Sequence, residues 1–384
     1  MHILYTYPEL IIKGGADKII IEKANYFVQH GYQVTIVTES QLGRQTAFPL
    51  DDRVKLIDMG LDFNKQYRHG SFKRLWIYLT LMRRYRCKLA EVLMTEKPDI
   101  AITTFGRSVN VLPYINDGSL KMGEAHTTKH YLRSLHLLEL RGGIYKYVTQ
   151  YMRCKMERSV ARLNDLVLLT PEDAAEWRGI TRTHVIPNPI PPLPSASAAL
   201  DNRQVLMVGR FNDSKGYNYL VEAWRIVHCK YPDWTLHAYG SGELHDQVVG
   251  WIKEHGLQDS FILHEPVDNI MDKYLESSIC VLSSRYEGFS LVLLEGMASG
   301  VPFVSFDCPY GPRNIIRNGE DGLLVEYLNP HALADGICRL IEDEALRKLM
   351  GSNARKNIQR FSKEKIMQQW EDLFRNMVGQ KNSD

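Results

Sequence analysis

Several motifs and features are missing from the 384-residue sequence, and each absence excludes a class of protein. No window approaches 18 uncharged apolar residues, so the sequence predicts no membrane-spanning helix. Glu9 and Lys13 interrupt the start of the chain, where a secretory signal would need an unbroken apolar stretch. The six cysteines include no C-x-x-C pair, which favours buried free thiols in a reducing compartment over disulfides or zinc ligands. We therefore predict a cytoplasmic location.

Common catalytic motifs are missing as well. The sequence contains no G-x-S-x-G, no Walker A motif and no H-E-x-x-H, which removes the commonest hydrolase and nucleoside triphosphatase classes. It also contains no D-x-D, so a metal ion that clamps a diphosphate would have no obvious ligands. We predict no metal site and no cofactor.

What is present indicates an ordinary globular chain of two α/β domains. Hydrophobic residues make up 44% and charged residues 24%, and the length suits two cores. Short β-branched runs alternate with amphipathic stretches such as 17–29 and 217–231, which predicts parallel sheets covered by helices on both faces. The predicted strands are 2–7, 32–38, 54–59, 100–104, 121–126, 166–170, 184–187, 204–209, 235–240, 261–264, 279–283, 303–307 and 322–325.

A proline-rich segment at 187–200 separates the two halves. It holds five prolines within eight positions, which is typical of a semi-rigid connection rather than a strand. The predicted domains are 1–188 and 189–363. The amphipathic last helix, roughly 362–378 with Ile366, Trp370 and Phe374, fits a last helix of the second domain as well as a bridge. We predict that residues 364–384 rejoin the first domain.

Charge is divided unevenly between the halves. Residues 1–190 carry 27 Lys/Arg and 19 Asp/Glu, whereas the remainder carries 20 and 26. The excess is densest at 63–90, which has no acidic residue and interleaves its cations with aromatic side chains. Such a stretch suits an anionic membrane surface, although a solvated basic face with inward-packed aromatics would look similar. Nucleic acid is a third possibility without a recognition motif. The cations are Lys65, Arg68, Lys73, Arg74, Arg83, Arg84, Arg86 and Lys88, and the aromatics include Tyr67, Phe72, Trp76, Tyr78 and Tyr85.

The segment 283–312 is the richest in candidate functional residues. A predicted strand ends at Ser283, and an apolar helix follows from about Ser290, so the free N–H groups of that helix make an anion site at the sheet edge. Glu287 lies in the intervening loop and Glu295 about one and a half turns into the helix. Carboxylates in these places can accept hydrogen bonds from the hydroxyls of a sugar or ribose. Gly288 lets the backbone approach a ligand closely.

Further candidates follow other predicted strands. Arg210 and Lys215, in the loop after 204–209, are placed for a phosphate, although a solvated loop would carry such cations too. Gly240 ends the next strand in a turn that can close on a ribose or base. The Gly14-Gly15 turn is of low specificity. His126, two residues after Glu124, fits a structural or a catalytic role equally well.

Taken in order, these segments resemble one family over nearly the whole chain. They are Gly14-Gly15, VIPNPI at 185–190, VGR at 208–210, Lys215-Gly216, YGSGE at 239–243, and Glu287-Gly288-Phe289 followed by Glu295. The series is similar to that of the retaining glycosyltransferases of family 4. SFDCPYGP at 305–312 looks like the branch that builds bacterial surface polysaccharides and glycan precursors on lipid carriers, often from UDP-hexoses or UDP-N-acetylhexosamines.

The resemblance implies a GT-B fold, an α/β architecture in which two Rossmann-like domains face each other across a cleft. It implies that a nucleotide sugar binds the second domain, that a glycan or lipid-linked glycan acceptor binds the first, and that the reaction retains configuration. The catalytic residues would be Glu287, His126, Lys215 and Arg210. The donor would contact Gly14, Gly15, Arg210, Lys215, Gly240, Val267, Glu287, Gly288, Phe289, Ser290, Leu291, Val292 and Glu295. Arg83, Arg84 and Arg86 would meet the membrane on its inner face.

One residue departs from the family pattern, and two other functions remain open. Asn314 stands where related sequences often carry glutamate, so the role of that position is in doubt. A sugar-nucleotide epimerase of the same double-Rossmann shape is one alternative, and a non-catalytic nucleotide-sugar-binding subunit is the other. The 287/295 carboxylates together with the 210/215 phosphate loop favour sugar transfer.

Overall fold

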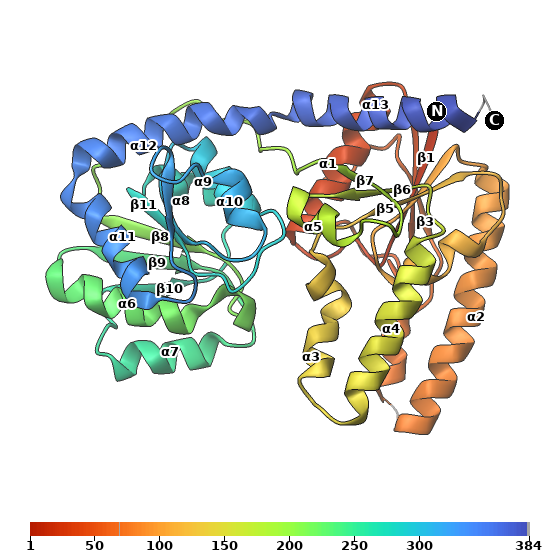
Figure 1. The fold of residues 1–384 in the computed structure, drawn as a ribbon, viewed down its shortest axis with the longest axis horizontal. Coiled ribbons are helices and arrows are strands. Elements are labelled where there is room, and N and C mark those ends of the chain that lie inside the picture. Colours follow the sequence, from red (N-terminus) through yellow and green to blue (C-terminus); the bar gives the residue numbers. More distant parts are fainter. Residues whose placement is uncertain (69, 382–384) are drawn as a thin grey trace. The chain divides into compact units, whose positions relative to one another are not determined.

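The computed structural model describes residues 1–68 and 70–381, which form two compact units (Figure 1). The first unit combines Met1–Ile186 with the residues from Gln368 onward, and the second is Pro187–Met367. The proline-rich segment 187–200 contains neither helix nor strand and belongs to the second unit. There the Ile190 N–H donates to the Phe361 carbonyl oxygen at 2.9 Å.

Seven parallel strands form the sheet of the first unit in the order β3-β2-β1-β4-β5-β6-β7. The strand order reverses between β1 and β4, and doubly wound sheets bind ligands at the carboxyl ends of strands beside such a point. The strands are β1 (His2–Tyr7), β2 (Gln33–Thr38), β3 (Lys55–Asp58), β4 (Ile100–Thr103), β5 (Leu120–Glu124), β6 (Asp165–Leu168) and β7 (Arg182–Val185).

Helices cover both faces of this sheet because successive side chains of a strand point to opposite sides. Leu4 of β1 packs in one core with Tyr85 and Leu89 of α2, whereas the ring of Tyr5 faces Lys23 of α1. The helices are α1 (Gly15–Gln29), α2 (Ser71–Glu96), α3 (Leu135–Glu139), α4 (Ile144–Val160), α5 (Pro171–Glu176) and the later part of α13 (Lys363–Lys381). Short 3-10 turns precede α2 and α3, at Phe63–Arg68 and Lys129–Ser134.

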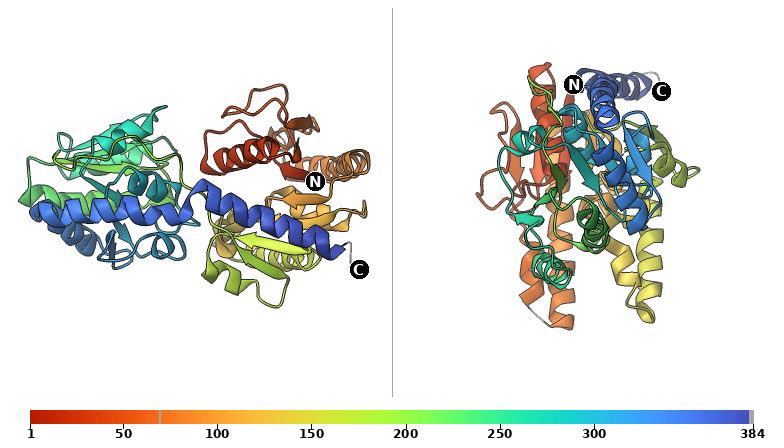
Figure 2. Two further views of the ribbon diagram at one scale, coloured as in Figure 1. Left: turned by 90° about the horizontal axis from the view of Figure 1, so that it is seen from above. Right: turned by 90° about the vertical axis from the view of Figure 1, so that its left-hand side faces the viewer.

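The last helix, α13, begins in the second unit and ends in the first. Its Phe374 ring lies 5.3 Å from that of Phe27 in α1, and the Lys23 ammonium lies 3.2 Å from the centre of the Trp370 ring. Both α13 residues are buried. Figure 2 shows this part of the helix along the first unit.

The second unit has a six-stranded parallel sheet in the order β10-β9-β8-β11-β12-β13. Its order reverses between β8 and β11, so the loops that follow these strands meet at the switch point. The strands are β8 (Gln204–Val208), β9 (Thr235–Tyr239), β10 (Phe261–His264), β11 (Ile279–Leu282), β12 (Phe303–Phe306) and β13 (Gly322–Val325). The helices are α6 (Tyr217–Lys230), α7 (His245–Glu254), α8 (Ile270–Leu275), α9 (Leu291–Ala298), α10 (Gly311–Ile315), α11 (Pro330–Glu342) and α12 (Glu344–Asn357).

The predicted fold class, two α/β units with parallel sheets, is confirmed. Each predicted strand corresponds to one strand of the structure, with ends that coincide or differ by at most two residues. The reason is that parallel strands buried on both faces appear in a sequence as short apolar runs.

Candidate functional site

The loops after β8 and β11 bring two predicted residues into direct contact. Lys215 Nζ lies 2.6 Å from Glu287 Oε1, and the Ser284 hydroxyl donates to the same oxygen at 2.7 Å. Only 17% of the Lys215 side chain and 11% of the Glu287 side chain are exposed. A cation and a carboxylate that lie 72 positions apart in the chain are therefore held in one semi-buried pair.

Glycines let these loops pack backbone against backbone. A Cβ on Gly216, whose φ is +61°, would lie 2.2 Å from the Ser283 carbonyl oxygen, and one on Gly240 would lie 1.9 Å from the Gly209 oxygen. No side chain fits either contact. Gly240 was predicted as a donor-binding residue, and the packing alone already requires glycine there.

A strained turn supports the Glu287 loop from the other side. Glu287 forms a backbone bridge with Tyr310, whose φ of 76° and ψ of −75° are rare for a residue with a side chain. A Cβ on Gly311 would lie 2.9 Å from the Glu287 Cβ. Asn314, the departure from the family pattern, donates to the Tyr310 carbonyl oxygen at 2.6 Å and so stabilises this turn.

Helix α9 begins directly after the Glu287 loop. Ser290 is its N-cap residue, and its buried hydroxyl has no hydrogen-bond partner in the part of the chain that the structure describes. The amides of Leu291 and Val292 belong to the first turn, where N–H groups lack helical acceptors. Phe289 packs on Phe361 with ring centroids 5.2 Å apart, which anchors the loop.

Three other predicted donor residues are Glu295, Val267 and Arg210. The Tyr274 hydroxyl donates to Glu295 Oε2 at 3.4 Å, and burial, then Glu295, raises the pKa of Tyr274. Val267 is exposed in the loop after β10. Arg210 is exposed and makes no ion pair with any described residue.

Sequence reasoning missed Arg285, which lies in the same loop as Glu287. Its guanidinium lies over the Tyr219 ring at 4.9 Å and donates to the Asn218 side-chain oxygen at 3.3 Å. Its Nε lies 3.3 Å from an Asp213 carboxylate oxygen. Arg285 therefore links the Glu287 loop to the start of α6. Its position two residues before Glu287 was the feature of the sequence from which it could have been predicted.

In the first unit, His126 follows β5 and ends a buried chain of polar groups. Its Nε2 lies 3.3 Å from Glu124 Oε1 without hydrogen-bond alignment, and Lys23 Nζ donates to both Glu124 oxygens at 2.7 Å. Burial lowers the pKa of His126, Lys23 lowers it further, and Glu124 opposes them. Burial likewise lowers the pKa of Lys23 to about 8. His126 is therefore neutral at pH 7 and can donate one hydrogen bond while it accepts another.

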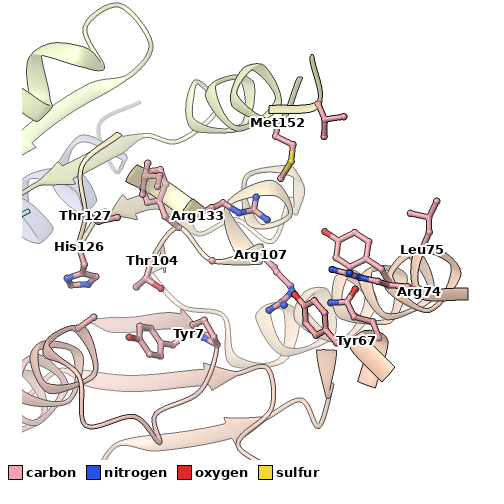
Figure 3. Close-up of a pocket in the computed structure, with 18 residues that line it drawn as sticks. Tyr7, Tyr67, Arg74, Leu75, Thr104, Arg107, His126, Thr127, Arg133 and Met152 are labelled. Carbon is pink, nitrogen blue, oxygen red and sulfur yellow. The ribbon is translucent and has the colours of Figure 1, made fainter. Parts of the chain in front are cut away.

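His126 also lines a cavity of about 1040 Å³ that lies within the first unit (Figure 3). The cavity opens at the carboxyl ends of β1, β4 and β5, beside the point where the strand order reverses. Three arginines line it, and no acidic side chain does so among the described residues. The arginines are Arg74, Arg107 and Arg133. Sequence analysis noted only Arg74, since Arg107 and Arg133 lie in irregular turns without a motif.

The Gly14-Gly15 turn lies at the start of α1 in the same unit. Gly14 is the N-cap residue, with an extended backbone, and Gly15 is the first helical residue. The approach of this turn to a diphosphate stays a prediction.

Helix α2 presents the predicted membrane residues on its surface. Arg83, Arg84 and Arg86 are exposed, as is Trp76, whereas Tyr85 is buried in the core. The predicted aromatic stretch is thus divided between two faces. The side chains of Arg68 and Phe72 lie outside the described residues. No helix in the described ranges is long and apolar enough to cross a membrane.

The described residues contain neither a disulfide nor a cluster of metal-ligating side chains. All six cysteines are free; Cys280, Cys308 and Cys338 are buried, whereas Cys87 and Cys229 are exposed. Among residues 1–68 and 70–381, no cluster of three or more His, Cys, Asp or Glu could hold a metal ion.

Residues 194–357 match the family model of glycosyl transferases group 1. The second unit is a group 1 glycosyltransferase domain. An uncharacterized glycosyltransferase of Haemophilus influenzae is 27% identical over 94% of this chain and 96% of its own length. The chain therefore contains a group 1 glycosyltransferase domain, shares its fold with GT-B glycosyltransferases, and has homologues that are named glycosyltransferases.

Two further similarities are more partial or more remote. A Campylobacter jejuni enzyme, named an N-acetylgalactosamine-N,N'-diacetylbacillosaminyl-diphospho-undecaprenol 4-alpha-N-acetylgalactosaminyltransferase, is 32% identical over 44% of this chain and 45% of its own length. The alignments with six relatives, this enzyme among them, cover between 24% and 49% of the length of each relative. The S. aureus TarM structure, which contains fondaparinux, α-GlcNAc-glycerol and UDP, has a TM-score of 0.79 at 18% identity, over 97% of this chain and 99% of that one.

Proposed function

We propose that the protein is a retaining, metal-independent hexosyltransferase of surface-polysaccharide biosynthesis. Its donor is a nucleotide sugar, with UDP as the favoured nucleotide and a hexose or N-acetylhexosamine as the transferred group. Its acceptor is a glycan on a lipid carrier, reached at the inner face of the cell membrane. The Lys215–Glu287 pair beside the start of α9 carries the proposal, because it combines a cation and a carboxylate in the group 1 domain.

The donor site follows from the chemistry of these groups. Lys215 and Arg210 neutralise the diphosphate, and the first amides of α9 donate hydrogen bonds to its oxygens. Glu287 accepts hydrogen bonds from sugar hydroxyls, and the Gly288 and Phe289 amides donate to them. Glu295 accepts from the ribose hydroxyls. Ser284 already fixes one Glu287 oxygen at 2.7 Å, so the carboxylate is oriented before the sugar binds.

Transfer then proceeds on one face of the sugar. The bond from the anomeric carbon to the diphosphate oxygen breaks, and the bond to the acceptor oxygen forms on the same side. The acceptor hydroxyl gives its proton to an oxygen of the leaving diphosphate. The protein mainly stabilises the negative charge of the leaving group, and neutral His126 donates a hydrogen bond to a hydroxyl of the sugar.

Two observations support the choice of substrates. UDP is bound in the TarM structure, which shares the fold, and the named substrate of the Campylobacter jejuni relative is a diphospho-undecaprenol carrier. The exposed cations of α2 add attraction to anionic lipid, about 1 kcal/mol for each one near the surface.

Donor discrimination tests the proposal. Calorimetry with UDP-, GDP- and ADP-sugars should give tight binding of one UDP-sugar. Product analysis by NMR, with and without a lipid-linked glycan acceptor, should give a new linkage of unchanged anomeric configuration. An epimerised nucleotide sugar formed without acceptor, or inverted configuration in the product, would show that the proposal is wrong.

A further inference from the structure

The cavity of the first unit has a charge that its own walls do not balance. Arg74, Arg107 and Arg133 line it, and the described lining contains no Asp or Glu. One carboxylate lies nearby: buried Glu39 accepts from Arg107 Nη1 at 2.5 Å. Because arginine stays protonated under all ordinary conditions, the cavity retains a positive excess.

Arg133 is the arginine of this lining with an unusual backbone. It sits at a kink inside the 3-10 segment Lys129–Ser134, in a left-handed conformation with φ of 55°. Burial lowers the pKa of Arg133, Arg107 lowers it further, and Tyr78 and Glu39 oppose them. Its side chain is directed toward the cavity in Figure 3. A poorly solvated guanidinium, in a pocket whose described lining has no acidic side chain, is matched by an anionic ligand, above all by a phosphate group, whose pairs of oxygens accept paired hydrogen bonds from arginine.

Another part of the lining is apolar and belongs to two helices. Leu75 of α2 and Val148 and Met152 of α4 line the cavity. Beyond them these helices carry exposed apolar side chains, Trp76 and Leu79 on α2 and Ile144, Tyr147 and Tyr151 on α4. Figures 1 and 2 show both helices projecting in the same direction from the sheet of the first unit. The apolar lining therefore leads from the arginines to two apolar helix surfaces.

We propose that this cavity anchors the acceptor as an amphiphilic anion. Arg133 and Arg107 hold a phosphate or diphosphate group, and the lipid chain that bears it leaves between α2 and α4, along Leu75, Val148 and Met152. The exposed apolar residues of the two helices, surrounded by cations such as Arg83 and Lys146, enter the membrane interface on either side of that chain. This inference rests on the proposed function in taking the acceptor to be lipid-linked.

Direct binding to the full chain, without any donor, tests the anion contact. The probes are farnesyl diphosphate, farnesol and inorganic pyrophosphate, each below the concentration at which micelles form. Wild type should bind farnesyl diphosphate at least tenfold more tightly than either of the others. Arg133→Gln should lower that affinity tenfold or more, because a charge-assisted contact is lost. Arg178→Gln, which removes an equal charge from an exposed position of the first unit, should leave it within twofold.

A second variant tests the lipid contact. Met152→Asp should weaken farnesyl diphosphate severalfold or more and leave pyrophosphate binding less affected, whereas Arg133→Gln should weaken both. Unchanged circular dichroism and thermal unfolding would exclude misfolding. Equal affinity for pyrophosphate and farnesyl diphosphate would overturn the proposal and point to the phosphate of a soluble polymer. Undiminished binding by Arg133→Gln would overturn it too.

The donor site provides an independent control. Binding of the UDP-sugar should be unchanged in Arg133→Gln and Met152→Asp, since Lys215 and Glu287 belong to the other unit. If wild type transfers sugar to a lipid-free glycan but ignores farnesyl diphosphate, this inference fails and sugar transfer stands. If no nucleotide sugar binds or reacts, the proposed function itself fails.

Discussion

Removing the Lys215 ammonium should separate catalysis from stability. Lys215→Ala deletes a charge that we propose contacts the leaving diphosphate, and the loss of one such transition-state contact commonly costs about 3 to 4 kcal/mol, or roughly 10² to 10³ in kcat. The effect on folding should be smaller. The 2.6 Å contact with Glu287 is neither fully buried nor exposed, so we expect a cost of about 1 to 2 kcal/mol, between the values for surface and buried pairs.

Glu287 allows the two effects to be checked together. In Lys215→Ala, Glu287 keeps the Ser284 hydroxyl but loses its cation, so adding Glu287→Gln should restore part of the lost stability. The two substitutions should therefore be non-additive in urea unfolding, with a coupling of about 0.5 kcal/mol or more.

The assay is the initial rate of nucleoside diphosphate release with saturating donor and acceptor, beside urea unfolding of each variant. Lys348→Ala is a matched control, because Lys348 pairs with Glu344 in the same unit but on an exposed helix surface. It should retain wild-type turnover. Turnover of Lys215→Ala within threefold of wild type would refute the placement of the diphosphate.

Four further outcomes are expected. Calorimetry with the free nucleoside diphosphate should show weaker binding by Glu295→Gln and normal binding by Glu287→Gln, which should lose turnover instead; equal losses would contradict the division of roles. Transfer should persist in excess chelator. The fraction of protein that sediments with anionic liposomes at low salt should decrease when Arg83, Arg84 and Arg86 are changed to Ser. If this variant binds the liposomes as well as the wild type does, membrane docking through these residues is refuted. Burial holds the pKa of His126 below its ordinary value near 6.5. As the pH falls below that value, the unfolded chain therefore binds more protons than the folded chain, and the free energy of unfolding decreases. Urea unfolding at pH 7 and 5.5 should show a smaller decrease of this free energy for His126→Asn than for the wild type.

The sequence predicted the strands well because each is a short apolar run between polar loops. The two residues of the Lys215–Glu287 pair were each identifiable as candidates, since both follow predicted strands. Their pairing was not, because contacts between residues so far apart depend on the strand order of the sheet. The arginine cavity was not predicted, for another reason. Arg133 lines it because Arg133 itself has a left-handed backbone conformation, and a single residue of this kind leaves no periodic pattern in the sequence.

The sequence pattern of α2 also did not determine which of its aromatic side chains are buried. A basic helix with aromatics at several positions can place them on either face. Packing against the first-unit core buries Tyr85 and leaves Trp76 67% exposed. Only the three-dimensional fold separates the core aromatic from the surface one.

The course of α13 has a consequence for synthesis of the protein. Trp370, Phe374 and Met377 are buried in a unit whose other residues end at Ile186. Each contributes about 1.5 to 3 kcal/mol by its burial, and the Trp370 ring covers the Lys23 ammonium. The ribosome makes the second unit between these two parts. The first unit to leave the ribosome is therefore the last to be completed, and a fragment that ends at residue 186 would expose the surface of α1 on which α13 normally lies.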